Sequence, residues 1–182
     1  MERDRGYHCG IPILKNLWSH HISLIWRPFL HHVSVFSHFT NRFFTNMPTI
    51  RVLDLSNNFQ LMELPVEIGD LVTLQYLNLS DTSIEYLPME LKNLKKLRWL
   101  ILNTMYFLES LPCQMVSSLS SLQLFSMYSR IVTKFKGDDE RRLLEELEQL
   151  EHIDHISIGL TSVSSIPTLF NSQGLQRSTR WL

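Results

Sequence analysis

The chain has 182 residues, 44% of them hydrophobic, and a formal net charge of -1. This length suits a single domain or a short repeat array, and the near-neutral charge excludes a strongly basic surface for nucleic acid or an anionic membrane. The two cysteines cannot build a disulfide framework, which favours a reducing, cytoplasmic location.

Residues 1–41 carry no repeat pattern that we can assign. The first residues, MERDRGYHCG, do not lead into the apolar core and cleavage site of a secretory signal. The most apolar stretch, HISLIWRPFLHHVSVF, is interrupted by arginine, proline and histidines, so we expect no membrane span, which needs about 18 apolar residues. A disordered segment, a divergent first coil and a wrongly joined exon all remain open for this region.

A repeated pattern begins after residue 42. The stretches IRVLDLSNN, LQYLNLSDT, LRWLILNTM, LQLFSMYSR and IDHISIGLT share leucine, isoleucine or another apolar residue at their first, fourth and sixth places. The period of about 24 residues and the LxxLxLxx(N/T) pattern are those of a leucine-rich repeat. We assign residues 42–182 to this repeat domain, with units that start near residues 50, 74, 97, 122 and 153.

The alternation within each unit predicts a strand with one buried face. Leu53 and Leu55 are expected to point inward, and the returning segment covers the same core with Leu61, Leu64, Ile68 and Leu71. Because one unit cannot bury enough surface to fold alone, neighbouring units must stack. The predicted fold is an α/β solenoid: a fragment of a leucine-rich-repeat horseshoe, with a parallel concave sheet and an irregular or short-helical convex side.

Two local features add detail to this prediction. Asn58 occupies the place where such repeats bond the turn with a side-chain amide, whereas later units have Thr82 and Met105 there, so the turn bonding should be less regular than in an ideal array. The apolar spacing in DDERRLLEELEQLEHI predicts one longer helix near 138–151, with Asp138 or Asp139 as its N-cap and a solvated charged face.

The outward strand positions should form columns across the sheet. The third positions are largely apolar and aromatic, and they are expected to face solvent, where such patches mark partner sites. We therefore predict a partner-binding surface on the concave face, centred on Tyr76 and Trp99; packing against a missing neighbouring domain, or ordinary sheet surface, is the competing interpretation. The predicted site consists of Arg51, Val52, Asp54, Tyr76, Asn78, Arg98, Trp99, Leu124 and His155.

No catalytic, metal or cofactor site is predicted. The histidines lack the ligand spacing of a zinc site, and no GxSxG nucleophile motif is present. Cys113 follows a Leu-Pro pair and is expected to be a small core residue rather than a nucleophile. An enzyme is therefore the least favoured of the functions.

The quoted repeats resemble those of plant intracellular nucleotide-binding leucine-rich-repeat disease resistance proteins of the coiled-coil class. The segment ELPVEIGDLVTLQYLNLSDTSIEYLPMELKNLKKLRWLILN is similar to the LPxxIxxLxxLxxLxLxxTxIxxLP pattern of that family, and DDERRLLEELEQLEHIDHISIGL is similar to a later segment. The resemblance implies a non-catalytic plant-defence module for recognition and autoregulation.

The resemblance also implies which partners to expect. They are a pathogen effector, a guarded host protein or the nucleotide-binding domain of a full-length relative. The GxxxxGK[ST] motif that such a domain uses for phosphates is missing, so we expect a truncated product or gene fragment without nucleotide binding. A general scaffold of the Ras-associated leucine-rich-repeat type is the main alternative, and an extracellular receptor ectodomain is disfavoured because LxGxIP repeats and paired-cysteine caps are missing.

Overall fold

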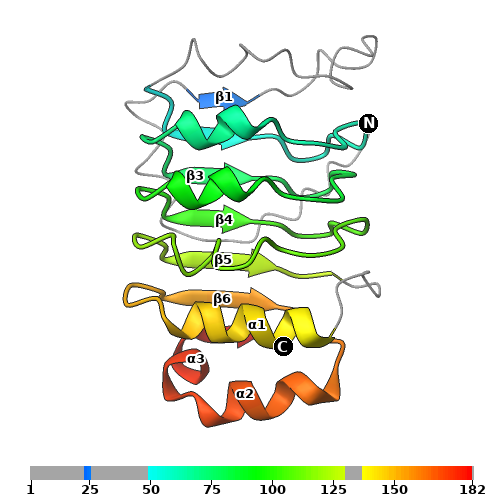
Figure 1. Cartoon of the computed structure of the whole chain (residues 1–182), viewed down its shortest axis with the longest axis vertical. Coiled ribbons are helices and arrows are strands. Elements are labelled where there is room, and N and C mark those ends of the chain that lie inside the picture. The colour runs from blue at the N-terminus through cyan, green and yellow to red at the C-terminus, as the bar shows by residue number, and fades with distance from the viewer. Residues whose placement is uncertain (1–22, 26–48, 130–136, 182) are drawn as a thin grey trace, which may run out of the picture.

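The computed structural model describes residues 23–25, 49–129 and 137–181. Within these residues, seven short strands form one parallel sheet in chain order. Figure 1 shows them stacked one above another, with helices in front of the sheet. The strands are β1 (Ser23–Ile25), β2 (Val52–Asp54), β3 (Tyr76–Asn78), β4 (Trp99–Ile101), β5 (Leu124–Met127), β6 (His155–Ile158) and β7 (Thr179–Trp181).

The register of the sheet repeats the period of the sequence. Leu53 of β2 lies opposite Leu77 of β3, which lies opposite Leu100 of β4. These three leucines are at most 1% exposed and belong to one continuous core, as Phe125 and Ile156 of the next strands do. The predicted stack of coils with parallel strands is therefore confirmed.

Short 3₁₀ helices cover the other side of the first coils. Helix η4 (Val66–Asp70) follows Pro65, and η5 (Met89–Asn93) follows Pro88. Proline suits the position before the first turn because its missing N–H would have no partner there. Each helix buries an apolar side chain, Ile68 or Leu91, against the core, which confirms the predicted short-helical side.

The corners after β2, β3 and β4 are tight turns that contain a residue in the left-handed conformation. Asn57, Asp81 and Thr104 have φ angles of 62°, 57° and 54° at equivalent places in successive coils. Asn58 donates its amide to the Leu55 carbonyl at 2.7 Å, and the equivalent Thr82 hydroxyl donates to Leu79 at 2.8 Å. The next unit has the buried residue Met105 at this place, so the bonding is irregular, as predicted.

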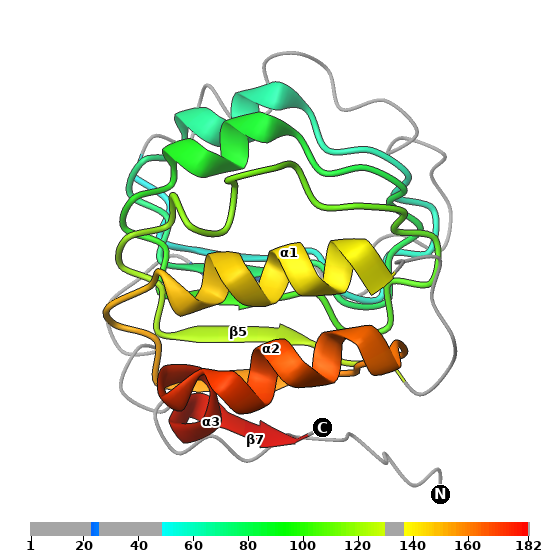
Figure 2. The ribbon, with the colours of Figure 1, turned by 60° about the horizontal axis from the view of Figure 1, so that its bottom comes forward.

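The later coils carry true helices. Helix α1 (Gly137–Glu148) lies beside β5 and β6 (Figures 1 and 2) and confirms the predicted longer helix. It begins at Gly137, so Asp138 and Asp139 lie inside the first turn and the prediction that one of them is the N-cap is wrong; their charges still face the positive end of the helix dipole.

The last coil contains elements that the sequence pattern did not indicate. These are the 3₁₀ helix η6 (Val163–Ser165) and the helices α2 (Ile166–Asn171) and α3 (Gln173–Ser178). Strand β1 also lies in the region left unassigned, and it pairs with β2 in the same register as the other coils. The rest of residues 1–41 lies outside the described residues.

Candidate functional site

The outward strand positions line up as predicted. Val52, Tyr76, Trp99 and Leu124 are directly opposite one another on β2 to β5, and Leu124 is opposite His155 on β6. Paired residues of neighbouring strands lie close enough for their side chains to touch. One column of apolar, aromatic and imidazole groups therefore crosses five coils.

The exposure of this column differs from the prediction. Trp99 is only 6% exposed and Leu124 only 7%, so the centre of the column does not face solvent. Arg98 covers part of the indole, since its guanidinium carbon lies 4.9 Å from the centroid of the Trp99 ring, within cation–π distance. Val52, Tyr76 and His155 are half-buried and remain accessible.

Within the column, Tyr76 lies near two polar side chains, Asp54 and Asn78. Burial raises the pKa of Tyr76 to about 12, the negative charge of Asp54 adds to the rise, and a hydrogen bond with the Asn78 side chain opposes it. The phenol therefore stays neutral well above physiological pH and keeps its hydrogen bond with the Asn78 side chain.

Two other predicted site residues also shape the turns. The Asp54 carboxylate accepts a hydrogen bond from the Ser56 N–H at 3.0 Å. The side-chain oxygen Oδ1 of Asn78 accepts hydrogen bonds from the Ser80 N–H at 3.1 Å and from the Ser80 hydroxyl at 2.7 Å. Each bond fixes the chain two residues on, as an Asx-turn does. Asp54 and Asn78 therefore have a structural role that the sequence analysis did not recognise.

A polar flank runs beside the column. Arg51 is exposed, whereas Arg98 is half-buried and donates from Nε to the Gln123 amide oxygen at 3.1 Å. Gln123 therefore belongs to the site, because it orients the arginine that covers Trp99. Its position in the strand pattern is the only sequence signal that could have identified it.

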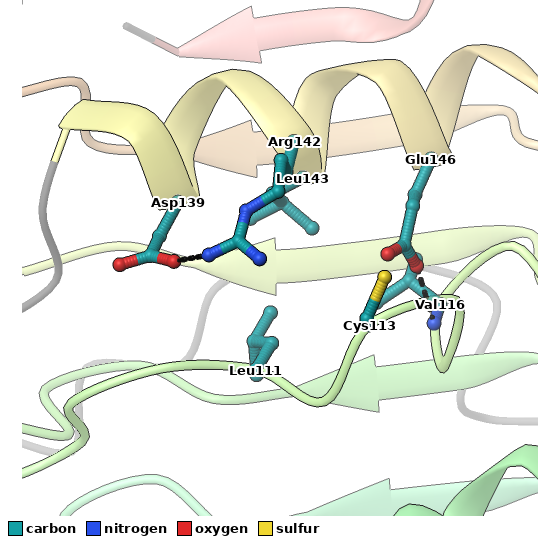
Figure 3. Close-up of a pocket in the computed structure, with 7 residues that line it drawn as sticks. All are labelled: Leu111, Cys113, Val116, Asp139, Arg142, Leu143 and Glu146. Carbon is teal, nitrogen blue, oxygen red and sulfur yellow. Dashed lines mark hydrogen bonds and ion pairs between the residues drawn. The ribbon is translucent and has the colours of Figure 1, made fainter.

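The helical side contains a small pocket between the third coil and α1. Figure 3 shows Arg142 paired with Asp139, and Glu146 bonded to the backbone at Val116. The other lining residues are Leu111, Cys113 and Leu143. Because the polar groups drawn are already paired with each other or the backbone, we treat this pocket as a packing defect rather than a binding site.

Cys113 is exposed, so the prediction of a core cysteine is wrong. It is the first residue after Pro112, and the equivalent residues after Pro65 and Pro88 are Val66 and Met89, which are 55% and 37% exposed. The residue after the proline faces outward in every one of these coils, whatever its polarity.

The charged face of α1 is also less solvated than predicted. Glu140 is 1% exposed and accepts hydrogen bonds from the Thr161 N–H at 2.8 Å, the Ser162 N–H at 3.1 Å and the Ser165 hydroxyl at 2.9 Å. A buried carboxylate is stable only with such partners. Elsewhere on the helix, Arg141 pairs with Asp138 and Glu145 in solvent, as expected for a charged surface.

No metal site is seen in the part of the chain that the structure describes. No three histidine, cysteine, aspartate or glutamate side chains come together in these residues. The first histidine cluster of the sequence, residues 20–38, lies outside them. None of the helices in the described ranges is both long and apolar enough to cross a membrane.

The stacked coils and their register define a leucine-rich repeat protein. A leucine-rich repeat region model matches residues 29–172, and the chain belongs to that family. The match includes the regular coils, α1 and α2, and it ends before α3 and β7.

Among known proteins, the chain is similar to plant disease resistance proteins. It is 47% identical to "Disease resistance protein RFL1" of Arabidopsis thaliana over 58% of this chain, and 41% identical to "Probable disease resistance protein At1g12290" of the same plant over 76%. These matches confirm the resemblance found in the sequence and do not favour the general scaffold. The chain spans only 12% and 15% of those two relatives.

Among solved structures, the chain matches part of the one titled "Plant peptide hormone receptor RGFR1 in complex with RGF2". The TM-score is 0.35 and the identity 20%, over 59% of this chain and 20% of the receptor chain.

Proposed function

We propose that this chain is the recognition and autoregulatory module of a plant intracellular disease resistance protein, and that it acts through protein–protein contact without catalysis. The single observation that carries the proposal is the column of Val52, Tyr76, Trp99, Leu124 and His155, aligned across five coils on the face opposite the helices. Its chemistry is that of a protein-binding surface, in which aromatic and arginine side chains supply most of the binding energy.

The accessible part of this surface is polar at its edges. Arg51, Tyr76 and His155 can reach a partner, whereas Trp99 and Leu124 form a rigid apolar floor. A floor of this kind supports recognition because the groups above it lose little conformational entropy on binding. We expect the partner to contact the arginine flank first, since exposed charges accelerate association.

The partner is a pathogen effector, a guarded host protein or the nucleotide-binding domain of a full-length relative. The relatives named above carry "disease resistance" in their names, and the chain is similar to a small part of each. A cytoplasmic location follows from the same proposal, since a nucleotide-controlled switch works inside the cell.

The test is binding of the purified chain to the nucleotide-binding domain of a coiled-coil-class resistance protein. The variant Arg51→Glu with Tyr76→Ala changes two groups that can reach a partner and should bind about ten-fold more weakly; because Tyr76 is half-buried, circular dichroism checks that the variant keeps its fold. Trp99 is unsuitable for this purpose because truncating a buried side chain also destabilises the core.

A matched control changes charges on the opposite side of the molecule. Lys92→Glu with Lys96→Glu alters exposed residues at and after η5 and should leave the affinity unchanged. If both double variants bind as the unchanged chain does, the strand face is not the recognition surface. If both double variants weaken binding equally, the interaction depends only on the overall charge of the chain and not on the strand face.

A further inference from the structure

A second surface of the molecule combines exposed apolar side chains with unneutralised carboxylates. Met62, Val66, Tyr86 and Met89 are 62%, 55%, 58% and 37% exposed, on the two coils that contain η4 and η5. Singly exposed apolar residues are ordinary, but a group of them on adjacent coils needs a reason. We call these four residues, together with Glu63, Glu67, Glu85 and Glu90, the acidic outer patch.

The fold brings these residues together. Glu63 and Tyr86 are opposite each other in a parallel bridge, one coil apart. Val66 and Met89 are the first residues of η4 and η5, which lie side by side (Figure 1). The two helices approach so closely that a Cβ on Gly69 would lie 2.7 Å from the Glu90 Cβ. The patch is therefore continuous across both coils.

The carboxylates of the patch have no cationic partners of their own. Within the described residues, none of Glu63, Glu67, Glu85 and Glu90 forms an ion pair. On α1, by contrast, Asp138 and Glu145 pair with Arg141, and Asp139 pairs with Arg142. Glu63 and Glu85 are exposed, and Glu67 and Glu90 are half-exposed. On η4 and η5 themselves, Glu67, Asp70 and Glu90 outnumber the single cation Lys92, and Glu63 and Glu85 add to the negative charge, so the local field attracts positive charge.

We propose that the acidic outer patch docks a basic amphipathic segment of a partner protein, in which apolar side chains are flanked by lysine or arginine. The apolar side chains would cover Met62, Val66 and Met89, and the cations would pair with the surrounding carboxylates. Charge complementarity fixes the sign of the partner, and the width of two coils suits one helix or strand. The acidic outer patch is separate from the strand face. Its docking role does not depend on the recognition function proposed for the strand face.

The test uses the full chain and a synthetic peptide of about 15 leucine and lysine residues at helical spacing, a length that allows helix formation on binding. Its affinity is measured by fluorescence anisotropy at low and high salt, and a peptide with glutamate in place of lysine serves as the negative probe. The lysine peptide should bind, more weakly at high salt, and the glutamate peptide should not. Absence of binding by the lysine peptide would overturn the proposal.

Matched variants locate the site. Glu63→Gln, Glu85→Gln and Glu90→Gln together should weaken binding about ten-fold, whereas Glu145→Gln, Glu148→Gln and Glu151→Gln remove the same charge from the region of α1 and should not. Met62→Ser with Val66→Ser should weaken binding while leaving its salt dependence unchanged. Equal losses in the two triple variants would show that the peptide senses only overall charge and would contradict the proposal.

A second copy of this chain is the competing occupant, because Lys92, Lys95 and Lys96 are exposed on the same molecule. Sedimentation of the unchanged chain distinguishes self-association from docking of a segment of another protein. A monomer supports docking of a foreign segment. A dimer that dissociates when the three lysines are replaced by glutamine would assign the patch to self-association and overturn the proposal.

Discussion

The carboxylate of Glu146 on α1 accepts the backbone N–H of Val116 at 2.9 Å, across a separation of 30 residues. It also accepts the N–H groups of Gln114 at 2.7 Å and Ser117 at 3.1 Å. Gln114 has a φ angle of 59°, so the turn points several N–H groups at one place. One side chain thus joins the helix of one coil to the turn of the coil before it.

Replacing Glu146 should therefore destabilise the stack. Glu146→Ala removes three charge-assisted hydrogen bonds, and we expect a loss of about 2 kcal/mol in the free energy of unfolding. Urea unfolding followed by circular dichroism measures it. The control is Glu145→Ala, whose ion pair with Arg141 is exposed and should contribute about half a kcal/mol or less. Equal effects of the two variants would contradict the role of Glu146.

Glu140 should matter still more, because it is buried. Glu140→Ala removes the carboxylate that accepts hydrogen bonds from the N–H groups of Thr161 and Ser162 and from the Ser165 hydroxyl, and we expect about 3 kcal/mol of destabilisation. The loss should be concentrated in the last coil, so hydrogen exchange of residues 161–165 should accelerate before that of β2 to β4. Thr161→Val, which removes one hydroxyl partner of Glu140, is the milder comparison; uniform acceleration across the chain would argue against a local cap.

Gly69 is predicted to be required for the close approach of η4 and η5. A Cβ at this position would lie 2.7 Å from the Glu90 Cβ and 2.8 Å from the Glu90 carbonyl oxygen, so backbone must move. We expect Gly69→Ala to cost about 1–3 kcal/mol in thermal or urea unfolding.

Gly174→Ala is the matched control for Gly69→Ala. The nearest atom to its Cβ is the Ser172 hydroxyl oxygen at 3.8 Å, and Gly174 lies in α3. Alanine is the better helix former, so this change should be neutral or stabilise by about half a kcal/mol. A neutral Gly69→Ala would mean that the two coils can separate at little cost.

The stability of the chain should fall at high pH through Tyr76. Its pKa is raised from 10.0 in the unfolded reference to about 12 in the fold, so the phenol stays protonated in the native state while the unfolded state loses its proton. The contribution is fully present below pH of about 10 and is lost as pH rises toward about 12. Unfolding free energies measured across this range, compared with those of Tyr76→Phe, should reveal the difference.

The tyrosinate absorbance offers an independent check of the same residue. Tyr76→Phe should remove a transition near pH 12. Tyr86→Phe is the comparison, because a hydrogen bond to the Glu109 carboxylate raises the pKa of Tyr86 at an exposed site. If Tyr76→Phe leaves the absorbance transition at the highest pH in place, the pKa of Tyr76 is not raised as described.

The period of the leucines was sufficient to predict the sheet. Each LxxLxL unit needs its neighbour to bury Leu53, Leu77 or Leu100, and only parallel stacking in register satisfies all of them. The columns on the strand face follow from the same register. Strand β1 escaped the prediction because Ser23–Ile25 lies outside the period of about 24 residues: Ser23 pairs with Val52, whereas Val52 pairs with Tyr76.

The site was harder to predict than the fold. Alternation determines which side of the sheet Trp99 occupies, but its 6% exposure depends on neighbours such as Arg98 that the pattern does not rank. The capping roles of Glu140 and Glu146 depend on backbone N–H groups more than twenty residues away. A charged residue on a helix gives no sign, in the sequence alone, of whether it meets water or a distant turn.

The pairing of β6 with β7 ends the common register at one side of the sheet. Ile156 is opposite Thr179 but Ser157 is opposite Trp181, so one residue is skipped and the common register ends there. From Val52 to His155, four strand-to-strand steps of about 4.8 Å make this column about 19 Å long. The spacing between neighbouring positions of the column is close to the ~5.4 Å pitch of an α-helix. It differs clearly from the ~3.3 Å rise of one residue in an extended chain.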